Sequence, residues 1–370
     1  GWFGARRNDR AGLGDWIANM ELLPNGISGL ANRIEELGMK FGLWIEPEMV
    51  NKDSDLYRKH PDWILQTPGR RVSHGRYQYV LDFSRQEIVD YIYGMIAKLL
   101  SESNISYIKW DMNRSITECY SIAYPADQQG EIFHRYILGV YNLYERLTSA
   151  FPEVLFESCA SGGGRFDPGM LYYAPQGWVS DDSDAVERLK IQYGTSMCYP
   201  LSSMGSHVSV IPNHQVFRNT PLHTRANVAY FGTFGYELDL NKLSDAEIEE
   251  VKAQIRFMKE YRELLQFGTF YRLKSPFNGN ETVWMVVSED KSKALVGYYR
   301  VLNGVNLPYS CVKLQGLDPD KLYENELANT KHYGDELMNL GLITTDVSAG
   351  EVPQGAEPCT DFESRIYLLK

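Results

Sequence analysis

With 370 residues, 44% of them hydrophobic, the chain is long enough for one large domain of barrel size and a smaller one. Its formal charge of −11 at pH 7, with no long basic run, argues against nucleic acid and against an anionic membrane surface as partners. The 25 tyrosines and 7 tryptophans favour instead a neutral polar ligand that stacks on aromatic rings.

The first 266 residues alternate between short apolar runs and amphipathic helical patterns. Strand-like runs are predicted at residues 41–45, 79–83, 107–111, 154–157, 177–181, 204–208 and 231–236. Helical patterns lie between these runs, and the pairs Ser84 with Glu87 and Ser244 with Glu247 have the spacing of capping boxes. Strand alternating with helix seven times predicts a parallel (β/α)8 TIM barrel that lacks its first strand, which would precede Gly1.

The pattern changes from about residue 267. Short runs at residues 282–287, 294–299 and 365–369 are separated by turn residues, which is typical of antiparallel strands. We therefore expect two domains, a catalytic barrel over residues 1–266 and a small C-terminal antiparallel β-sandwich over residues 267–370.

Two acidic side chains stand at the ends of predicted strands. Asp111 ends the run 107–111, and Asp181, 70 positions later, ends the run 177–181. The carboxyl ends of barrel strands converge on one face, so we expect the two carboxylates to meet over a single ligand. Glycoside hydrolysis uses such a pair, and a retaining mechanism needs the two carboxyl groups roughly 5–6 Å apart.

The neighbours of the two aspartates suggest different roles. Lys109 and Arg114 would lower the pKa of Asp111, which suits a nucleophile that must stay ionised. Asp181 lies in an acidic run behind Trp178, and these surroundings would raise its pKa, which suits a general acid. A structural alternative for Asp181 is an acidic helix N-cap.

Aromatic and cationic side chains at other strand ends could bind a sugar. The first strand-like run delivers Trp44 and the acids of Glu46-Pro47-Glu48 to its carboxyl end. Trp44 and Trp178 would offer ring faces to the apolar side of a sugar, whereas Lys109 and Arg76 would donate to its hydroxyls. The alternative for either tryptophan is a place in the core.

Three further motifs have a chemical and a plainer interpretation. Residues 161–164, Ser-Gly-Gly-Gly, could cradle a phosphate, but no GKS or GKT follows, so close approach of the backbone to a sugar is the better interpretation. His207 and His214 could be a metal pair or two hydrogen-bonding loop residues. Cys159 stands at a strand end without a local histidine to activate it, so we expect an apolar wall of the site and no nucleophile.

The cysteines are scattered, odd in number and without a CxxC spacing. They are Cys119, Cys159, Cys198, Cys311 and Cys359. This usage predicts reduced thiols in a cytoplasmic protein and no zinc site.

Several long motifs stand in one order along the chain. They are Gly-Trp-Phe-Gly at 1–4, GLWIEPEMV at 42–50, KWDMN at 109–113, ESCASGGGRFD at 157–167 and WVSDDSDA at 178–185. On these motifs the chain resembles the bacterial α-galactosidases of glycoside hydrolase family 36 over essentially its whole length.

The resemblance implies a retaining α-galactosidase with Asp111 as the nucleophile and Asp181 as the acid/base. The galactose-binding residues of the family fall on Trp44, Arg76, Lys109, Asn113, Cys159, Gly162 and Trp178. The resemblance further implies homotetramers, no metal or organic cofactor, and galactose-containing oligosaccharides such as melibiose, raffinose and stachyose as substrates.

One departure from the family pattern concerns the start of the chain. The family has an Asp-Asp pair directly before the Gly-Trp-Phe-Gly motif, preceded by a first barrel strand and a large β-domain, and the pair binds galactose hydroxyls. For this polypeptide alone we therefore expect an unclosed barrel, an incomplete sugar subsite, and weak or no activity.

Two other classes of function stay open on the sequence. The same covalent intermediate could be transferred to a sugar hydroxyl, as in galactosyltransferases, or the sugar could be N-acetylgalactosamine. A non-catalytic carbohydrate-binding protein would keep the tryptophans but could dispense with one acid, and both candidate acids are present.

Overall fold

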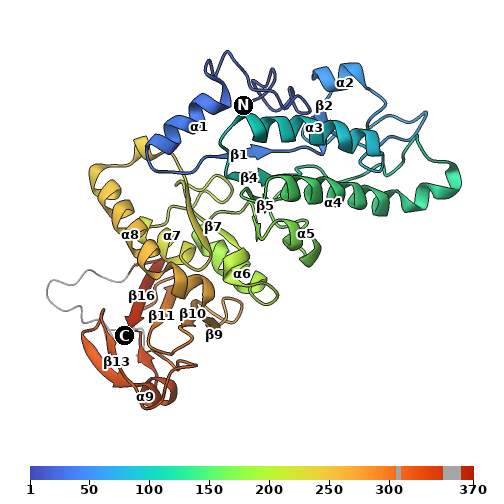
Figure 1. Cartoon of the computed structure of the whole chain (residues 1–370). Helices are drawn as coiled ribbons and strands as arrows, with labels where there is room; N and C mark the ends of the chain where they lie inside the picture. The colour runs from blue at the N-terminus through green and yellow to red at the C-terminus, as the bar shows by residue number, and fades with distance from the viewer. Residues whose placement is uncertain (306–309, 345–359) are drawn as a thin grey trace. The chain divides into compact units, whose positions relative to one another are not determined.

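The computed structural model describes residues 1–305, 310–344 and 360–370 (Figure 1). The chain divides into two compact units, Gly1–Trp178 and Val179–Lys370. Cys359 lies outside the described residues, and the four other cysteines are free thiols. Within the described ranges, no helix has both the length and the apolar character that a bilayer crossing requires.

A parallel four-stranded sheet forms the centre of the first unit. Its strands follow the order β1 (Gly42–Ile45), β4 (Tyr107–Trp110), β5 (Leu155–Ser158) and β6 (Gln176–Gly177). Each neighbouring pair is parallel, so the carboxyl ends of all four strands lie at one edge of the sheet. In parallel barrels this edge carries the functional side chains.

Helices cover the first sheet. Helices α3 (Gln86–Glu102) and α4 (Ile132–Ala150) pack against each other and run side by side in Figure 1. Trp110 at the end of β4 stacks on Tyr144 of α4 with ring centroids 3.9 Å apart, which ties strand and helix into one apolar core. The other helices of this unit are α1 (Gly26–Glu36), α2 (Asp55–Lys59), the 3-10 helix η1 (Ala126–Glu131) and α5 (Pro168–Tyr173).

The strand predicted at residues 79–83 departs from the parallel pattern. It forms as β3 (Gln78–Val80), but it pairs antiparallel with β2 (Met49–Asn51), outside the four-stranded sheet. Helix α2, the helix between the two strands, has only five residues, and the chain returns to pair β3 beside β2 with residues Met49 and Val80 opposite each other. The prediction of a parallel unit here is therefore wrong.

The two predicted capping boxes have different outcomes. Helix α3 begins at Gln86 with Arg85 as its N-cap and has no side-chain cap, and the hydroxyl of Ser84 donates to Asp82. At the start of α8 (Asp245–Phe267), Ser244 and Glu247 make both hydrogen bonds of the box, as predicted.

The second unit begins with a parallel pair of strands. Strands β7 (Gly205–Ser209) and β8 (Thr233–Glu237) pair in register from end to end. Together with the four strands of the first sheet, β7 and β8 make six parallel strands in the described part of the chain. The helices of this part are α6 (Ala185–Thr195), η2 (Leu201–Ser203), α7 (Leu222–Ala229), η3 (Leu240–Lys242) and α8.

An antiparallel sheet of six strands completes the second unit. Its order is β14 (Thr330–Tyr333), β13 (Leu322–Asn325), β16 (Glu363–Leu369), β11 (Ala294–Arg300), β10 (Glu281–Val287) and β9 (Thr269–Lys274). A smaller antiparallel pair, β12 (Cys311–Val312) with β15 (Leu342–Ile343), shares an apolar core with this sheet, as does α9 (Gly334–Asn339). The expected antiparallel C-terminal part is therefore present.

Candidate active site

Asp111 directly follows β4 at the carboxyl edge of the first sheet. Its backbone N–H extends the ladder to the carbonyl of Ile45 at 2.8 Å, so its position is set by the strands. The carboxylate is buried and accepts three hydrogen bonds. Trp44 Nε1 and Asn113 Nδ2 donate to Oδ2 at 3.1 and 2.5 Å, and the backbone N–H of Met112 donates to Oδ1 at 2.8 Å. A carboxylate held this way keeps one orientation, as attack on a fixed carbon requires.

Cys159 lies beside Asp111 at the end of the neighbouring strand. Its backbone N–H donates to the carbonyl of Trp110 at 2.8 Å, and its thiol is buried, close enough to the Asp111 carboxylate to be influenced by its charge. Burial first, and then the negative charge of Asp111, raise the pKa of Cys159 far above its usual range. The thiol therefore stays protonated at neutral pH, which agrees with a wall of the site and argues against a nucleophile.

Lys109 pairs with a buried glutamate on β5. Its Nζ lies 3.2 Å from Oε1 of Glu157 and 4.6 Å from the ring centroid of Trp178. The other carboxylate oxygen of Glu157 accepts from Gln176 Nε2 at 2.9 Å and from the Tyr107 hydroxyl. The ammonium group is thus held between a carboxylate and an aromatic face.

Arg114 does not contact Asp111 as the sequence suggested. Its guanidinium donates to the backbone carbonyl of Ser73 at 2.9 Å and to Thr117 Oγ1 at 3.0 Å, and lies 3.5 Å from Glu118. Arg114 therefore ties its own loop to the segment around Ser73.

The glycine-rich segment after β5 folds back toward Asn113. Gly162 is buried with φ of +82°, a conformation that favours glycine, and its carbonyl accepts from the backbone N–H of Ala160 at 2.8 Å. The hydroxyl of Ser161 donates to Asn113 Oδ1 at 3.3 Å. This arrangement places a tight backbone turn next to the Asp111 carboxylate.

A buried ion pair anchors the end of that segment. Arg165 donates through Nη1 and Nη2 to the two carboxylate oxygens of Glu48 at 2.8 Å each. Trp110 Nε1 donates to the same carboxylate at 2.8 Å, as does the hydroxyl of Tyr136. These bonds compensate the burial of the Glu48 charge.

Glu46 is a second buried acid close to Asp111, and Arg76 is a charged neighbour of Glu46. Arg76 is exposed with φ of +52°, and its charge acts on the buried carboxylate of Glu46. Glu46 accepts from the backbone N–H of Asn113 and from Gln78 Nε2, the latter at 3.0 Å. Burial is the main cause that raises the pKa of Glu46 to about 7, and the nearby charge of Asp111 adds to it.

Asp181 belongs to the second unit and is exposed there. It is not the N-cap of α6. Asp184 takes that place, because its carboxylate accepts from the backbone N–H groups of Val186 and Glu187 at 3.1 Å each. The structural alternative for Asp181 is therefore wrong. Its backbone carbonyl accepts from Gln215 Nε2 at 3.1 Å.

His207 lies beside an acidic side chain in the second unit. Nδ1 of His207 lies 3.6 Å from a carboxylate oxygen of Glu237 on the neighbouring strand. Over the residues that the structure describes, no group of three or more His, Cys, Asp or Glu side chains is arranged to hold a metal ion.

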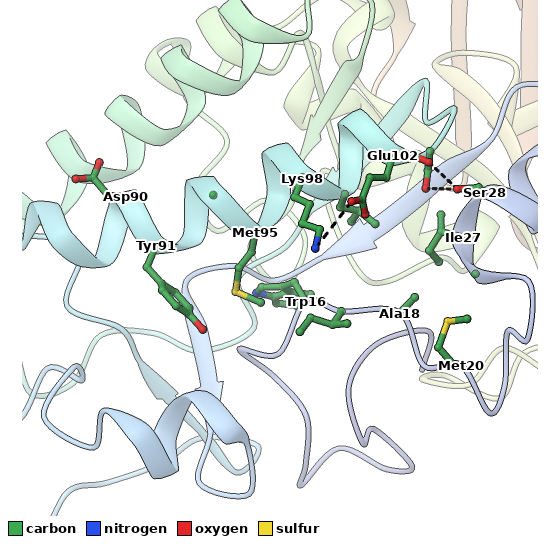
Figure 2. Close-up of a pocket in the computed structure, with 15 residues that line it drawn as sticks. Trp16, Ala18, Met20, Ile27, Ser28, Asp90, Tyr91, Met95, Lys98 and Glu102 are labelled. Atoms are coloured by element: carbon green, nitrogen blue, oxygen red, sulfur yellow. Dashed lines mark hydrogen bonds and ion pairs between the residues drawn. The ribbon is translucent and has the colours of Figure 1, made fainter.

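A separate groove of about 660 Å³ lies in the first unit (Figure 2). Tyr91 and Met95 project from α3 on the side of Trp16, and Lys98 lies 3.9 Å from Glu102 at the groove's polar end. None of the predicted site residues lines it. A smaller cavity of about 270 Å³ does adjoin the site, where Asn113 and Ser161 form part of its lining.

Eight of the nine predicted site residues thus lie in the first unit. Glutamates 46, 48 and 157 were not predicted as site residues, although all three end strands that the sequence located. Their position in or shortly after a strand was the available signal, whereas the partners of Glu46 and Glu48 include loop residues whose path has no simple pattern.

Residues 1–268 match the family model described as Melibiase, and residues 281–369 match that of the glycosyl hydrolase family 36 C-terminal domain. The chain belongs to the Melibiase family. The resemblance predicted from its motifs is confirmed.

Curated members of the family are similar over the whole chain. Alpha-galactosidase AgaA of Geobacillus stearothermophilus is 57% identical over 370 residues, which is 100% of this chain and 49% of that protein. Alpha-galactosidase Mel36A of Lactobacillus acidophilus is 50% identical over the same share of this chain and 49% of its own length. The chain therefore spans about half the length of these relatives.

Solved structures of the family confirm the predicted fold class. The crystal structure of AgaA matches with a TM-score of 0.95 at 54% identity, over 100% of this chain and 50% of that chain. The α-galactosidase of Lactobacillus brevis matches with the same TM-score at 50% identity, over 100% of this chain and 49% of its own. The family fold is a TIM barrel followed by an antiparallel β-domain.

Proposed function

We propose that the protein with this chain is a retaining α-galactosidase that removes terminal α-galactose from oligosaccharides of the raffinose type. The observation that carries the proposal is the Asp111 carboxylate, buried at a strand end and held by three donors. Membership of the Melibiase family supports the proposal, and so do two structures of AgaA described as complexes with raffinose and with stachyose.

The reaction proceeds in two displacements. In the first, the Asp111 carboxylate attacks the anomeric carbon, and the carboxyl group of Asp181 gives its proton to the departing oxygen. In the second, the ionised Asp181 takes a proton from water, whose oxygen attacks the same carbon and breaks the ester bond to Asp111. Two inversions release galactose with its original anomeric configuration.

The surrounding side chains bind the sugar. Trp44 and Trp178 offer ring faces to its apolar side, while Lys109 and Arg76 donate to its hydroxyls. Asn113 and Cys159 line the ring next to the nucleophile, and Gly162 lets the backbone approach closely. The ion pair of Lys109 with Glu157 keeps that cation in place for a neutral ligand.

The spacing of two substitutions in AgaA supports the roles of the two aspartates. The structure described with raffinose carries an Asp-to-Asn change and the one described with stachyose an Asp-to-Ala change, at positions 70 residues apart. Asp111 and Asp181 have the same spacing. Replacement of a catalytic carboxylate is a common way to keep a substrate intact in a crystal.

The test is to trap the covalent intermediate. The protein at its natural length is incubated with a fluorinated galactoside whose second displacement is slow, digested, and mapped by mass spectrometry. We expect the label on Asp111, and none on an Asp111→Asn variant. A label on any other residue, or a product of inverted configuration by NMR, would contradict the proposal.

A further inference from the structure

A chain of hydrogen bonds leads from β3 to the candidate nucleophile. Gln78 Nε2 donates to Glu46 Oε2 at 3.0 Å, and the other carboxylate oxygen accepts from the backbone N–H of Asn113. The side-chain amide of Asn113 then donates to Asp111 Oδ2 at 2.5 Å. Glu46 thus reaches Asp111 through a single intervening residue.

Glu46 lies at the end of β1 and is fully buried, with an exposed fraction of 0%. A carboxylate in such a place is costly unless its oxygens are satisfied, and here each oxygen has an N–H donor. The charged groups that face it are Asp111, Arg76 and Arg6. No reaction step described above uses this carboxylate, so its presence beside the nucleophile needs another explanation.

Asn113 connects the two carboxylates because it is held at both ends. Its backbone is tied to Glu46, and its side-chain carbonyl accepts from the Ser161 hydroxyl at 3.3 Å, which leaves the NH₂ group aimed at Asp111. A change at Glu46 would therefore shift the backbone of Asn113 and, with it, the donor that orients the nucleophile.

We propose that Glu46 is a positioning residue of the active site, which holds Asn113 so that its amide keeps the Asp111 carboxylate oriented for attack. This inference rests on the proposed galactosidase function. It assigns a role in the reaction to a buried glutamate that does not touch the reacting atoms, since orientation of the attacking group strongly affects the rate.

The ionisation of Glu46 offers a second measurable sign. Its pKa is raised to about 7, chiefly by burial, so it gains a proton as the pH falls through neutrality. The ionised carboxylate of Glu46 accepts from both Gln78 and Asn113, whereas the protonated form carries an O–H that would itself need an acceptor. We therefore expect kcat/KM to fall as the pH falls below about 7, where Glu46 gains its proton.

The main experiment is a double-mutant cycle with an aryl α-galactoside. Glu46→Gln keeps the shape but offers one acceptor oxygen in place of two, and we expect kcat to fall about tenfold with little change in KM. Asn113→Ala removes the connecting amide. If Glu46 acts through that amide, the double variant should lose no more activity than Asn113→Ala alone.

Asp82→Asn is the matched control. Asp82 is an equally buried carboxylate of the same unit that accepts from Ser84 and Ser121. We expect it to lower the melting temperature but to leave kcat and the pH limb unchanged. Glu46→Gln should instead lose the limb near neutrality, an effect that a purely structural role would not produce.

The outcomes separate this inference from the proposed function. Absence of turnover in the wild-type protein would overturn the function. Two results in an active wild-type background would overturn the inference alone. In one, the losses of activity in Glu46→Gln and Asn113→Ala multiply in the double variant; in the other, the acidic limb of the pH profile survives in Glu46→Gln. If Glu46→Gln does not fold, Gln78→Ala can replace it, because this variant removes the donor on the far side of Glu46. We expect Gln78→Ala to lower kcat by a smaller factor, and to cause no further loss of kcat when it is combined with Asn113→Ala.

Discussion

Charged side chains near Asp111 have an oppositely charged or hydrogen-bonding partner within the first unit. Lys109 is paired with Glu157, Glu48 with Arg165, and Glu46 accepts two N–H donors. A neutral sugar does not compensate a buried charge, so a site for such a ligand has to satisfy its ionised groups internally. The residues around Asp111 meet this condition within the first unit.

Glu157→Gln should weaken sugar binding. The variant takes away the carboxylate that lies 3.2 Å from Lys109 Nζ, so the ammonium loses its fixed position over Trp178. We expect KM for an aryl α-galactoside to rise about fivefold or more and kcat to change less, because Lys109 binds the ground state and the transition state alike.

Glu131→Gln provides the comparison for this prediction. It breaks an exposed ion pair, with Arg135 at 2.7 Å, that is far from the predicted sugar contacts in sequence. Exposed pairs contribute little, so both constants should stay within error. Equal effects of the two substitutions would argue against a role of Glu157 in holding Lys109.

Sequence reasoning could place three of the predicted site residues side by side because each lies at the end of a strand. Trp44, Asp111 and Cys159 end three adjacent parallel strands, and parallel strands bring their carboxyl ends together without further information. Glu46 was seen as an acid at a strand end, but its bond to Asn113 joins two loops. Whether a loop carboxylate is buried depends on the path of the backbone, which no periodic pattern predicts.

At the scale of elements, helix α4 packs very closely against the backbone at Phe83, which follows β3. A Cβ atom added at Gly139 would lie 1.9 Å from the backbone carbonyl oxygen of Phe83. Backbone cannot move away as a flexible side chain can, so this glycine is required by packing and not by its conformation.

Gly139→Ala should therefore destabilise the protein by about 2 kcal/mol or more, since α4 would have to shift from the core. Gly94→Ala is the control in α3, where the added Cβ meets nothing within 4 Å. In that open helical position alanine should stabilise by up to about 1 kcal/mol. Midpoints of urea denaturation that move in the same direction for both variants would contradict this account.

The predicted elements were right where a local signal agreed with the tertiary fold. Ser244 is the N-cap residue of α8 and forms the box with Glu247, whereas α3 begins one residue later than predicted, with Arg85 as its N-cap. The strand at 79–83 had the composition of a barrel strand, but its partner was β2. Composition predicts that a segment is extended, but the strand with which it pairs depends on the path of the chain between them.

At the scale of the whole molecule, the alternation of strands and helices predicted the fold class, and the order of the long motifs predicted the family. The antiparallel sheet of the second unit was predicted from its short apolar runs. Its strands β10 and β11 are buried along nearly their whole length, because one face meets the β12–β15 layer and Tyr299 on the other face donates to the carbonyl of Asn227 in α7 at 2.6 Å. That second contact was not predictable from strand periodicity.

Chemical rescue tests the central claim most directly, since it asks which aspartate attacks and which transfers the proton. Asp111→Ala and Asp181→Ala variants of the protein at its natural length are given an activated aryl α-galactoside and azide, and the galactosyl azides are identified by NMR. We predict β-galactosyl azide from Asp111→Ala, because azide attacks the substrate directly. We predict α-galactosyl azide from Asp181→Ala, because azide attacks the covalent intermediate. The opposite assignment of the two products, or rescue of neither variant in a protein whose wild type is active, would contradict the account.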